Sequence, residues 1–120
     1  MTAGLTVWES CTTAEGIVTL ARPQDWRVIT PGVELAELAS LPPGRRVLLC
    51  RIQAGALLAE HTLPVDGVTF VMQGAGEMSF PGSPPRRYRA GDTLLVRAQV
   101  PHALQADDGA DVLLGTALMA

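Results

Sequence analysis

The sequence contains no lysine and no asparagine, and each absence excludes a class of function. All nine basic residues are arginines, so Schiff-base catalysis, a lysine-bound pyridoxal cofactor and a phosphate-loop lysine are excluded. Without asparagine there is no N-glycosylation acceptor. The arginines are scattered and the net charge is −3, which predicts no nucleic-acid partner. No apolar stretch approaches the roughly 20 residues of a membrane span, so no membrane association is expected.

Cysteine is also scarce. Cys11 and Cys50 form neither a close-spaced metal pair nor a disulfide framework. Cys50 is expected to be a small buried core residue, because free cysteine is among the most buried residue types, and Cys11 lies in a polar stretch. Residues 1–10 carry neither a basic start nor a long apolar run, so no signal peptide is predicted and a cytoplasmic location is expected.

Hydrophobic residues, glycine and proline are abundant. The chain has 120 residues, 48% of them hydrophobic, with 12 glycines and 9 prolines, which is enough for one domain with a sizeable core. Only short runs fit between the glycines and prolines, which predicts an all-β sandwich or barrel. The predicted strands are residues 16–21, 33–41, 46–54, 68–72, 76–80, 86–88, 93–96, 102–106 and 112–117. Residues 33–40 include helix-favouring Glu and Ala, but flanking prolines make a strand at least as compatible.

Two of these segments are apolar on both faces: residues 46–52, R-V-L-L-C-R-I, and residues 68–72, V-T-F-V-M. A strand with one face in water alternates apolar and polar residues, so both segments should be covered on each side. The simplest second cover is another subunit, which predicts a homodimer. The alternative is that Phe70 and Met72 lie under the N-terminal segment. Residues 1–25 are predicted to be an N-terminal strand or arm in the dimer interface.

A basic run, R-R-Y-R, surrounds the only tyrosine, Tyr88. The three arginines could form a small basic patch. An exposed strand edge protected by charge is the favoured interpretation, because charged side chains at an edge discourage pairing with another chain.

Two segments resemble the paired signatures of the cupin superfamily. Residues 55–74 read GALLAEHTLPVDGVTFVMQG, and residues 91–106 read GDTLLVRAQVPHALQA. Gly55, His61 and Gly74 occupy family positions in the first segment, and Gly91 and His102 do so in the second. Residues 26–38 resemble the lead-in strands of small single-domain cupins, including the cupin domains of ChrR-type anti-sigma factors. The resemblance covers residues 26–117 and implies that residues 26–120 form a single-domain cupin barrel, a double-stranded β-helix or jelly roll.

The resemblance also implies a metal site, from which this sequence departs. Cupins hold a divalent ion with His-x-His and Glu from the first signature and His from the second. Leu63 stands at the second histidine position and Gly67 at the glutamate position, so His61 and His102 remain. Three protein ligands are usual for a catalytic metal. We therefore expect at most a weakly held Ni, Zn, Fe or Mn ion on His61 and His102, at low occupancy.

Two acidic residues lie close to the missing glutamate position and are weighed as replacements. Asp66 is the candidate third ligand, since it immediately precedes Gly67. A displacement of one residue on a strand turns the side chain to the opposite face, so Asp66 would reach the site only through a bulge. Glu60 fails for the same reason of parity.

The barrel interior is the expected ligand site. Residues 67, 69, 71 and 73 share one face of a strand, and the resemblance makes that face interior. The predicted ligand contacts are His61, Leu63, Thr69, Gln73 and His102. One alternative is that the histidines only form hydrogen bonds with each other, with water or with a backbone carbonyl. Another is that Gln73 lies at the rim, just before the turn at Gly74.

The sequence is compatible with three functions. The favoured one is a barrel that binds a small organic ligand, with or without a weakly held divalent metal. The second is an enzyme of dioxygenase, isomerase or cyclase type, in which His61 or His102 would act as general acid or base. The third is a regulatory or structural dimer with a relic pocket. No catalytic residue is assigned, and the enzyme question stays open.

Overall fold

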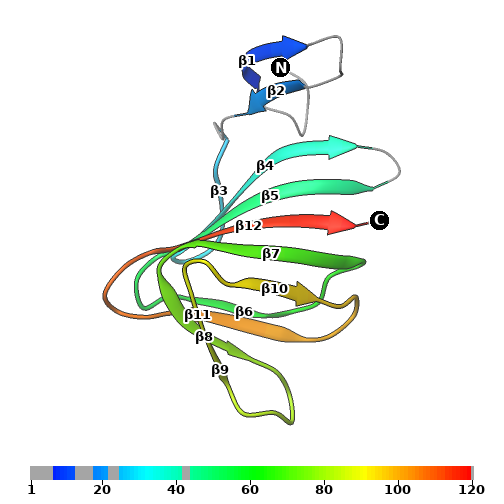
Figure 1. Ribbon diagram of the computed structural model, residues 1–120. Coiled ribbons are helices and arrows are strands. Elements are labelled where there is room, and N and C mark those ends of the chain that lie inside the picture. The colour runs from blue at the N-terminus through cyan, green and yellow to red at the C-terminus, as the bar shows by residue number, and fades with distance from the viewer. Residues whose placement is uncertain (1–6, 13–17, 22–24, 42–43, 120) are drawn as a thin grey trace.

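The computed structural model describes residues 7–12, 18–21, 25–41 and 44–119, with side chains for residues 25–40 and 44–119. The described residues form strands joined by turns (Figure 1). These are β1 (Val7–Thr12), β2 (Val18–Ala21), β3 (Arg27–Thr30), β4 (Val33–Leu41), β5 (Arg45–Ile52), β6 (Leu57–His61), β7 (Asp66–Gln73), β8 (Ala75–Ser79), β9 (Arg86–Arg89), β10 (Thr93–Val96), β11 (His102–Ala106) and β12 (Val112–Met119). Within those ranges no helix is long and apolar enough to cross a membrane.

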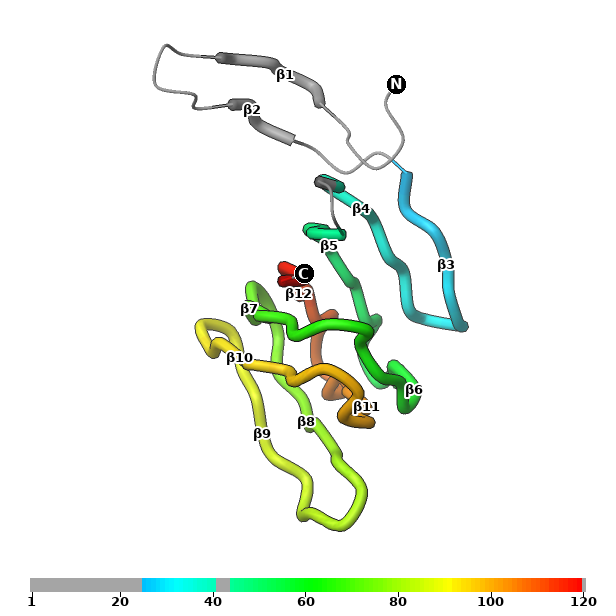
Figure 2. Tube along the Cα trace, turned by 90° about the vertical axis from the view of Figure 1, so that its right-hand side faces the viewer, coloured from blue at the N-terminus to red at the C-terminus, as the bar shows by residue number. Residues whose placement is uncertain are grey.

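Two antiparallel sheets form the body of the molecule. The six-stranded sheet has the order β10-β7-β12-β5-β4-β3, and the four-stranded sheet has the order β6-β11-β8-β9. The chain passes between them after β5, β6, β7, β9, β10 and β11, so neighbours in sequence often lie in opposite layers (Figure 2). This exchange between layers is the jelly-roll arrangement, and it confirms the predicted all-β double-stranded β-helix.

The core lies between the two sheets, where alternate residues of each strand point inward. On β11, for example, His102, Leu104 and Ala106 are buried while Gln105 is exposed. On β5 the inward residues include Cys50 and Ile52. Such alternation follows from the two-residue period of a strand. The remaining core residues are Val33, Val71, Met78, Tyr88, Val112 and Leu114.

Most predicted strands are present. Residues 33–41 form strand β4, as predicted, and no helix. The predicted strand 16–21 is observed as β2, Val18–Ala21, which pairs with β1. Strands β1, β3 and β6 were not predicted. Both β3 and β6 are short edge strands in which two apolar residues are adjacent, Val28 with Ile29 and Leu57 with Leu58, so they lack the alternating pattern that identifies a longer strand.

Tyr88 departs from the prediction of an exposed edge. Strand β9 is indeed an edge of the four-stranded sheet, and its arginines are exposed. Tyr88 itself is 2% exposed, and its hydroxyl donates to the Gln105 carbonyl at 2.8 Å. The phenol passes beside Gly76, where an added Cβ would meet both the Tyr88 hydroxyl and the Gln105 carbonyl. The middle residue of the run points inward because side chains alternate along a strand.

The outer face of the six-stranded sheet is apolar. One row crosses the sheet through paired residues, from Leu95 through Val68, Ala117 and Val47 to Ala39. These residues alternate with those that face the core, so they point away from it. We call this surface, together with Leu49, Phe70 and Met72, the outer apolar face.

The sequence predicts that another layer covers this face, because residues 46–52 and 68–72 are apolar on both sides of the strand. Phe70 is 50% exposed and Met72 is 56% exposed, so neither is buried beneath the described part of this chain. The placement of residues 1–6, 13–17 and 22–24, together with the side chain of Cys11, lies outside the described residues. The homodimer and the role of residues 1–25 in its interface stay predictions.

Candidate functional site

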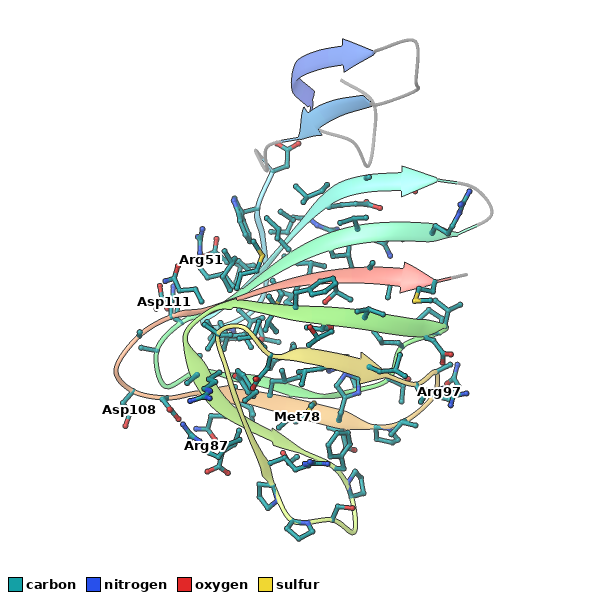
Figure 3. All side chains as sticks on the ribbon, in the orientation of Figure 1. Arg51, Met78, Arg87, Arg97, Asp108 and Asp111 are labelled. Atoms are coloured by element: carbon teal, nitrogen blue, oxygen red, sulfur yellow. The ribbon has the colours of Figure 1, made fainter. Side chains whose placement is uncertain are left out.

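A cavity of about 430 Å³ lies between the two sheets, and we call it the central cavity. Aliphatic side chains from both sheets make up most of its wall, among them Leu35, Leu48, Leu58, Leu94 and Leu114. Met78 points into the same interior, whereas Arg51, Arg87 and Arg97 lie at the periphery (Figure 3). The cavity is therefore mainly apolar, and the polar groups in its wall are the ones that could orient a ligand.

The histidines of the two signature segments come together at this cavity. His61 ends β6 and His102 begins β11, and the two residues pair directly in the antiparallel ladder. Their ring centroids lie 4.3 Å apart with the ring planes tilted by 55°. Both rings line the cavity. The structure thus brings together two residues that are 41 positions apart in sequence, 102 minus 61.

Hydrogen bonds to the backbone determine the tautomer of both rings. Nδ1 of His61 donates to the Ala59 carbonyl at 2.8 Å, and Nδ1 of His102 donates to the Val100 carbonyl at 2.9 Å. A carbonyl oxygen only accepts, so each Nδ1 carries the proton. In a neutral imidazole the other nitrogen, Nε2, is then an acceptor with a free lone pair. Each ring is held from behind and offers Nε2 for binding.

His102 is the more deeply placed of the two rings, with 3% of its surface exposed. Burial lowers the pKa of His102 below its usual value, because a charged imidazolium would lose hydration in the cavity wall. The hydrogen bond to Val100 opposes this shift, and the neighbouring His61 adds to it. The balance favours a neutral ring that accepts hydrogen bonds.

Two threonines supply the other paired polar group of the wall. Thr69 on β7 and Thr116 on β12 face each other across the ladder, and their hydroxyl oxygens are 2.8 Å apart. Thr69 was predicted to line the interior, and it does so. Thr116 was not predicted, although it shares inward parity with Val112 and Leu114, which could have identified it.

Leu63 and Gly67 are structurally linked. Leu63 lines the cavity, and its Cδ1 atom lies 2.8 Å from where a Cβ at position 67 would be. Leu118 and Thr116 approach the same point at 3.4 and 3.6 Å. A side chain at position 67 would therefore compete with Leu63 for space. The two departures from the family signature form one packing unit.

Asp66 does not serve as a third metal ligand. Its carboxylate accepts from the Ala98 backbone N–H at 2.7 Å and from Arg97 Nε at 3.2 Å, and it does not line the cavity. The Ala98 hydrogen bond, with help from Arg97, lowers the pKa of Asp66. Glu60 was predicted to face away; its side chain is exposed, yet the residue contributes to the cavity wall.

The residues around the histidines do not fit the divalent metal that the resemblance implies. Within residues 25–40 and 44–119, no group of three or more His, Cys, Asp or Glu side chains could hold an ion. The Nε2 atoms of His61 and His102 are suitable donors, but Leu63 fills the space near the glutamate position. Two nitrogen ligands fall short of the usual three.

Gln73 is a correction to the predicted site. It is exposed and does not line the cavity. The register between β7 and β12 shifts at this point, because Leu114 pairs with Val71 while Leu113 pairs with Gln73. Such a β-bulge adds a residue to one strand and changes which way the following side chains point. Parity within β7 therefore stops predicting orientation after Val71.

Cys50 and Arg51 lie on opposite faces of β5. Cys50 lines the cavity and is buried, as predicted, and burial raises the pKa of its thiol to about 11. A thiol that stays protonated is a poor nucleophile. Arg51 faces outward, where its guanidinium lies 4.3 Å from the centroid of the Trp26 ring and 3.6 Å from the Glu34 carboxylate.

Several solved structures share this fold. The sequence itself matches no protein-family model and no curated protein. A cupin-like protein from Thermotoga maritima is 21% identical, with a TM-score of 0.66 over 72% of this chain and 68% of that protein. A salicylate 1,2-dioxygenase from Pseudaminobacter salicylatoxidans is 24% identical, with a TM-score of 0.67 over 75% of this chain and 27% of the enzyme.

A third similar structure is a complex. A chain in the crystal structure of Rhodobacter sphaeroides SigE with the anti-sigma ChrR is 26% identical, with a TM-score of 0.67 over 78% of this chain and 48% of that one. This chain therefore spans about half of that protein and about a quarter of the dioxygenase.

Proposed function

We propose that this chain, which has the fold of the cupin superfamily, binds a small organic molecule in the central cavity. The observation that carries the proposal is the pair of histidines whose Nδ1 atoms donate to backbone carbonyls, so that each ring in its neutral form presents an accepting Nε2 in an otherwise apolar space. Ligand pockets typically combine such an apolar wall with a few polar groups that orient the ligand. The volume of about 430 Å³ lies within the usual range for such pockets.

A matched pair of leucines on β6 tests whether the cavity is the binding site. Leu58 lines the cavity, whereas its neighbour Leu57 is exposed and does not. Leu58→Phe should weaken binding of an uncharged fluorescent probe, N-phenyl-1-naphthylamine, by about tenfold or more, and Leu57→Phe should leave it unchanged. Fluorescence titration measures both. Equal affinities in the two variants would place the probe elsewhere.

A histidine variant tests the polar part of the site. Any ligand that binds the native state raises the melting temperature, and the shift grows with the ratio of ligand concentration to dissociation constant. We expect His61→Ala to abolish the shift caused by the probe, because His61 provides half of the polar pair. A full shift in His61→Ala would exclude the histidines as the contact.

A regulatory or structural dimer is the second candidate, and the outer apolar face favours it. Leu95 is 65% exposed on that face, beside the half-exposed Phe70. The similarity to a chain in the complex of SigE with the anti-sigma ChrR supports the same candidate at the level of fold. If the cavity variants leave every property of the protein unchanged while variants of the outer face alter its assembly, this candidate is preferred.

A metal-dependent enzyme of dioxygenase type has less support. The similarity to salicylate 1,2-dioxygenase is one of fold, and the ligand set that such chemistry needs is incomplete around His61 and His102. A metal-free isomerase or cyclase would use a neutral Nε2 as general base.

A further inference from the structure

We infer that the ligand of the central cavity is an uncharged, mainly apolar molecule whose head group presents O–H or N–H donors to His61 and His102, and that the cavity rejects carboxylates. The inference deepens the proposed function and rests on it. A primary amide or a vicinal diol on a hydrocarbon body is the chemical class that fits.

The hydrogen bonds behind the rings determine this preference. The only proton of each neutral imidazole is donated from Nδ1 to a backbone carbonyl, of Ala59 for His61 and of Val100 for His102. Each Nε2 can then only accept. An ionised carboxylate is also acceptor-only, so it would meet two lone pairs with no proton between them. A ligand N–H or O–H completes the contact.

The charges around the cavity lead to the same result. The chain has no lysine, and no arginine belongs to the described wall of the cavity. Arg51, Arg87 and Arg97 lie at the periphery, where each pairs with a surface carboxylate (Figure 3). The one carboxylate in the described wall is Glu60, which is exposed and offers an anion no partner. Burying a carboxylate without a partner is costly.

A cation is disfavoured for a related reason. The wall is mostly aliphatic, and an ammonium group would lose its hydration there. Glu60 is exposed and remains in water, so it compensates little of that loss. An uncharged donor pays no such cost.

The spacing of the polar groups favours a head group with two adjacent donors. The ring centroids of His61 and His102 are 4.3 Å apart on directly paired residues, so one small group can reach both. On the opposing sheet, one hydroxyl of the Thr69–Thr116 pair donates to the other, and the second hydroxyl keeps a proton to donate. Two acceptors and one donor match the two N–H groups and the carbonyl of a primary amide.

The test compares three ligands of equal chain length at pH 8, where an imidazole with the ordinary pKa of about 6.5 is neutral. Octanamide, octanoate and methyl octanoate are titrated into the chelator-treated 120-residue chain, and nuclear magnetic resonance shifts give the dissociation constants. We expect octanamide to bind at least about tenfold more tightly than octanoate, with the donor-free ester between them. Octanoate binding as tight as octanamide, or no octanamide binding at all, would overturn the inference.

A gain of function provides a second readout. His61→Arg replaces an acceptor with a fixed cation and five donors, so the preference should invert and octanoate should bind more tightly than octanamide. An unchanged preference in a folded His61→Arg protein would contradict the inference.

Leu58→Phe and Leu57→Phe separate this inference from the proposed function. If octanamide binds equally to both variants, the central cavity is not the site and the proposed function fails. If binding depends on Leu58 but octanoate is as tight as octanamide, the cavity binds ligands and only the inferred ligand class is wrong.

Discussion

At the scale of single residues, Leu63 and Gly67 explain why the metal site of the fold is incomplete. The Leu63 side chain occupies the room that a side chain at position 67 would need. Changing one position without the other leaves either an overfilled or an underfilled wall. Overpacking a core usually costs about 1–3 kcal/mol, so the two positions are expected to behave as a coupled pair.

The coupling predicts the outcome of restoring the family pattern. Gly67→Glu alone should lower the melting temperature, because its Cβ would press on Leu63. The double variant Leu63→His, Gly67→Glu should recover stability on adding Ni or Zn and should carry more metal than the parent protein. Elemental analysis after dialysis measures the metal content, and Leu63→Ala, Gly67→Ala serves as the control without ligands. No gain in metal would mean that these positions do not face the two histidines as aligned.

Tyr88 predicts a pH dependence that a single spectroscopic signal can follow. Burial raises the pKa of Tyr88 to about 12, with the nearby Asp107 adding to the shift. An unfolded tyrosine ionises near pH 10, so between pH 10 and 12 the unfolded state has released a proton that the folded state retains. The contribution of Tyr88 to the free energy of unfolding should therefore be intact below pH 10 and decrease as pH rises toward 12.

The measurement uses the fact that the chain has one tyrosine. Phenolate absorbance near 295 nm reports Tyr88 alone, and its midpoint should lie well above that of the protein in concentrated urea. Coincident midpoints would show that the ring is not buried against Gly76. The variant Tyr88→Phe should lose the Tyr88 part of the pH dependence in this window, while the part from Cys50, whose pKa burial raises to about 11, should remain.

At the scale of elements, the bulge between β7 and β12 gives the side chains of Thr69 and Gln73 different orientations. Thr69 bonds Thr116 across the ladder and lines the cavity, whereas Gln73 is exposed. Thr69→Val should cost about 1 kcal/mol, because it leaves the Thr116 hydroxyl without its partner. Gln73→Ala should change stability by less than about 0.5 kcal/mol.

Urea unfolding measures both variants. The double variant Thr69→Val, Thr116→Val should be less destabilised than the sum of the single changes, since it removes both hydroxyls together. A larger loss in Gln73→Ala than in Thr69→Val would contradict the assigned orientations. Ligand binding in Gln73→Ala should equal that of the parent protein.

At the scale of the whole molecule, the outer apolar face is the feature that the described residues leave uncovered. Monomeric soluble proteins rarely expose contiguous apolar patches of more than a few hundred Å². Two six-stranded sheets can pack face to face with interdigitated side chains, and stable pairs bury about 800 Å² on each partner. We expect a homodimer that joins the two outer apolar faces.

Light scattering on protein at micromolar concentration tests the dimer. The mass should be twice the 12.7 kDa of one chain, and Phe70→Glu should reduce it to that of the monomer by placing charge in the centre of the face. Leu57→Glu is the control, because Leu57 is an exposed leucine on the other sheet. A monomeric parent protein would remove the prediction.

The sequence by itself was sufficient for most of the strands, although not for β1, β3 and β6, and it identified the two histidines. Short apolar runs between glycines and prolines predict strands because a strand is defined by a local period of two residues. The resemblance of the segments around His61 and His102 to the cupin signatures implied the barrel interior, and both residues line the cavity. Such inferences succeed because they depend on neighbours in the chain.

Tertiary structure alone decided the features that depend on pairing across sheets. Gln73 points outward because β7 slips against β12, Tyr88 is buried because it passes over Gly76, and Asp66 bonds Ala98 from a distant turn. The Nδ1 bonds that make both histidines acceptors likewise require the folded ladder. Register and hydrogen-bond partners come from residues far apart in sequence, and no local period specifies them.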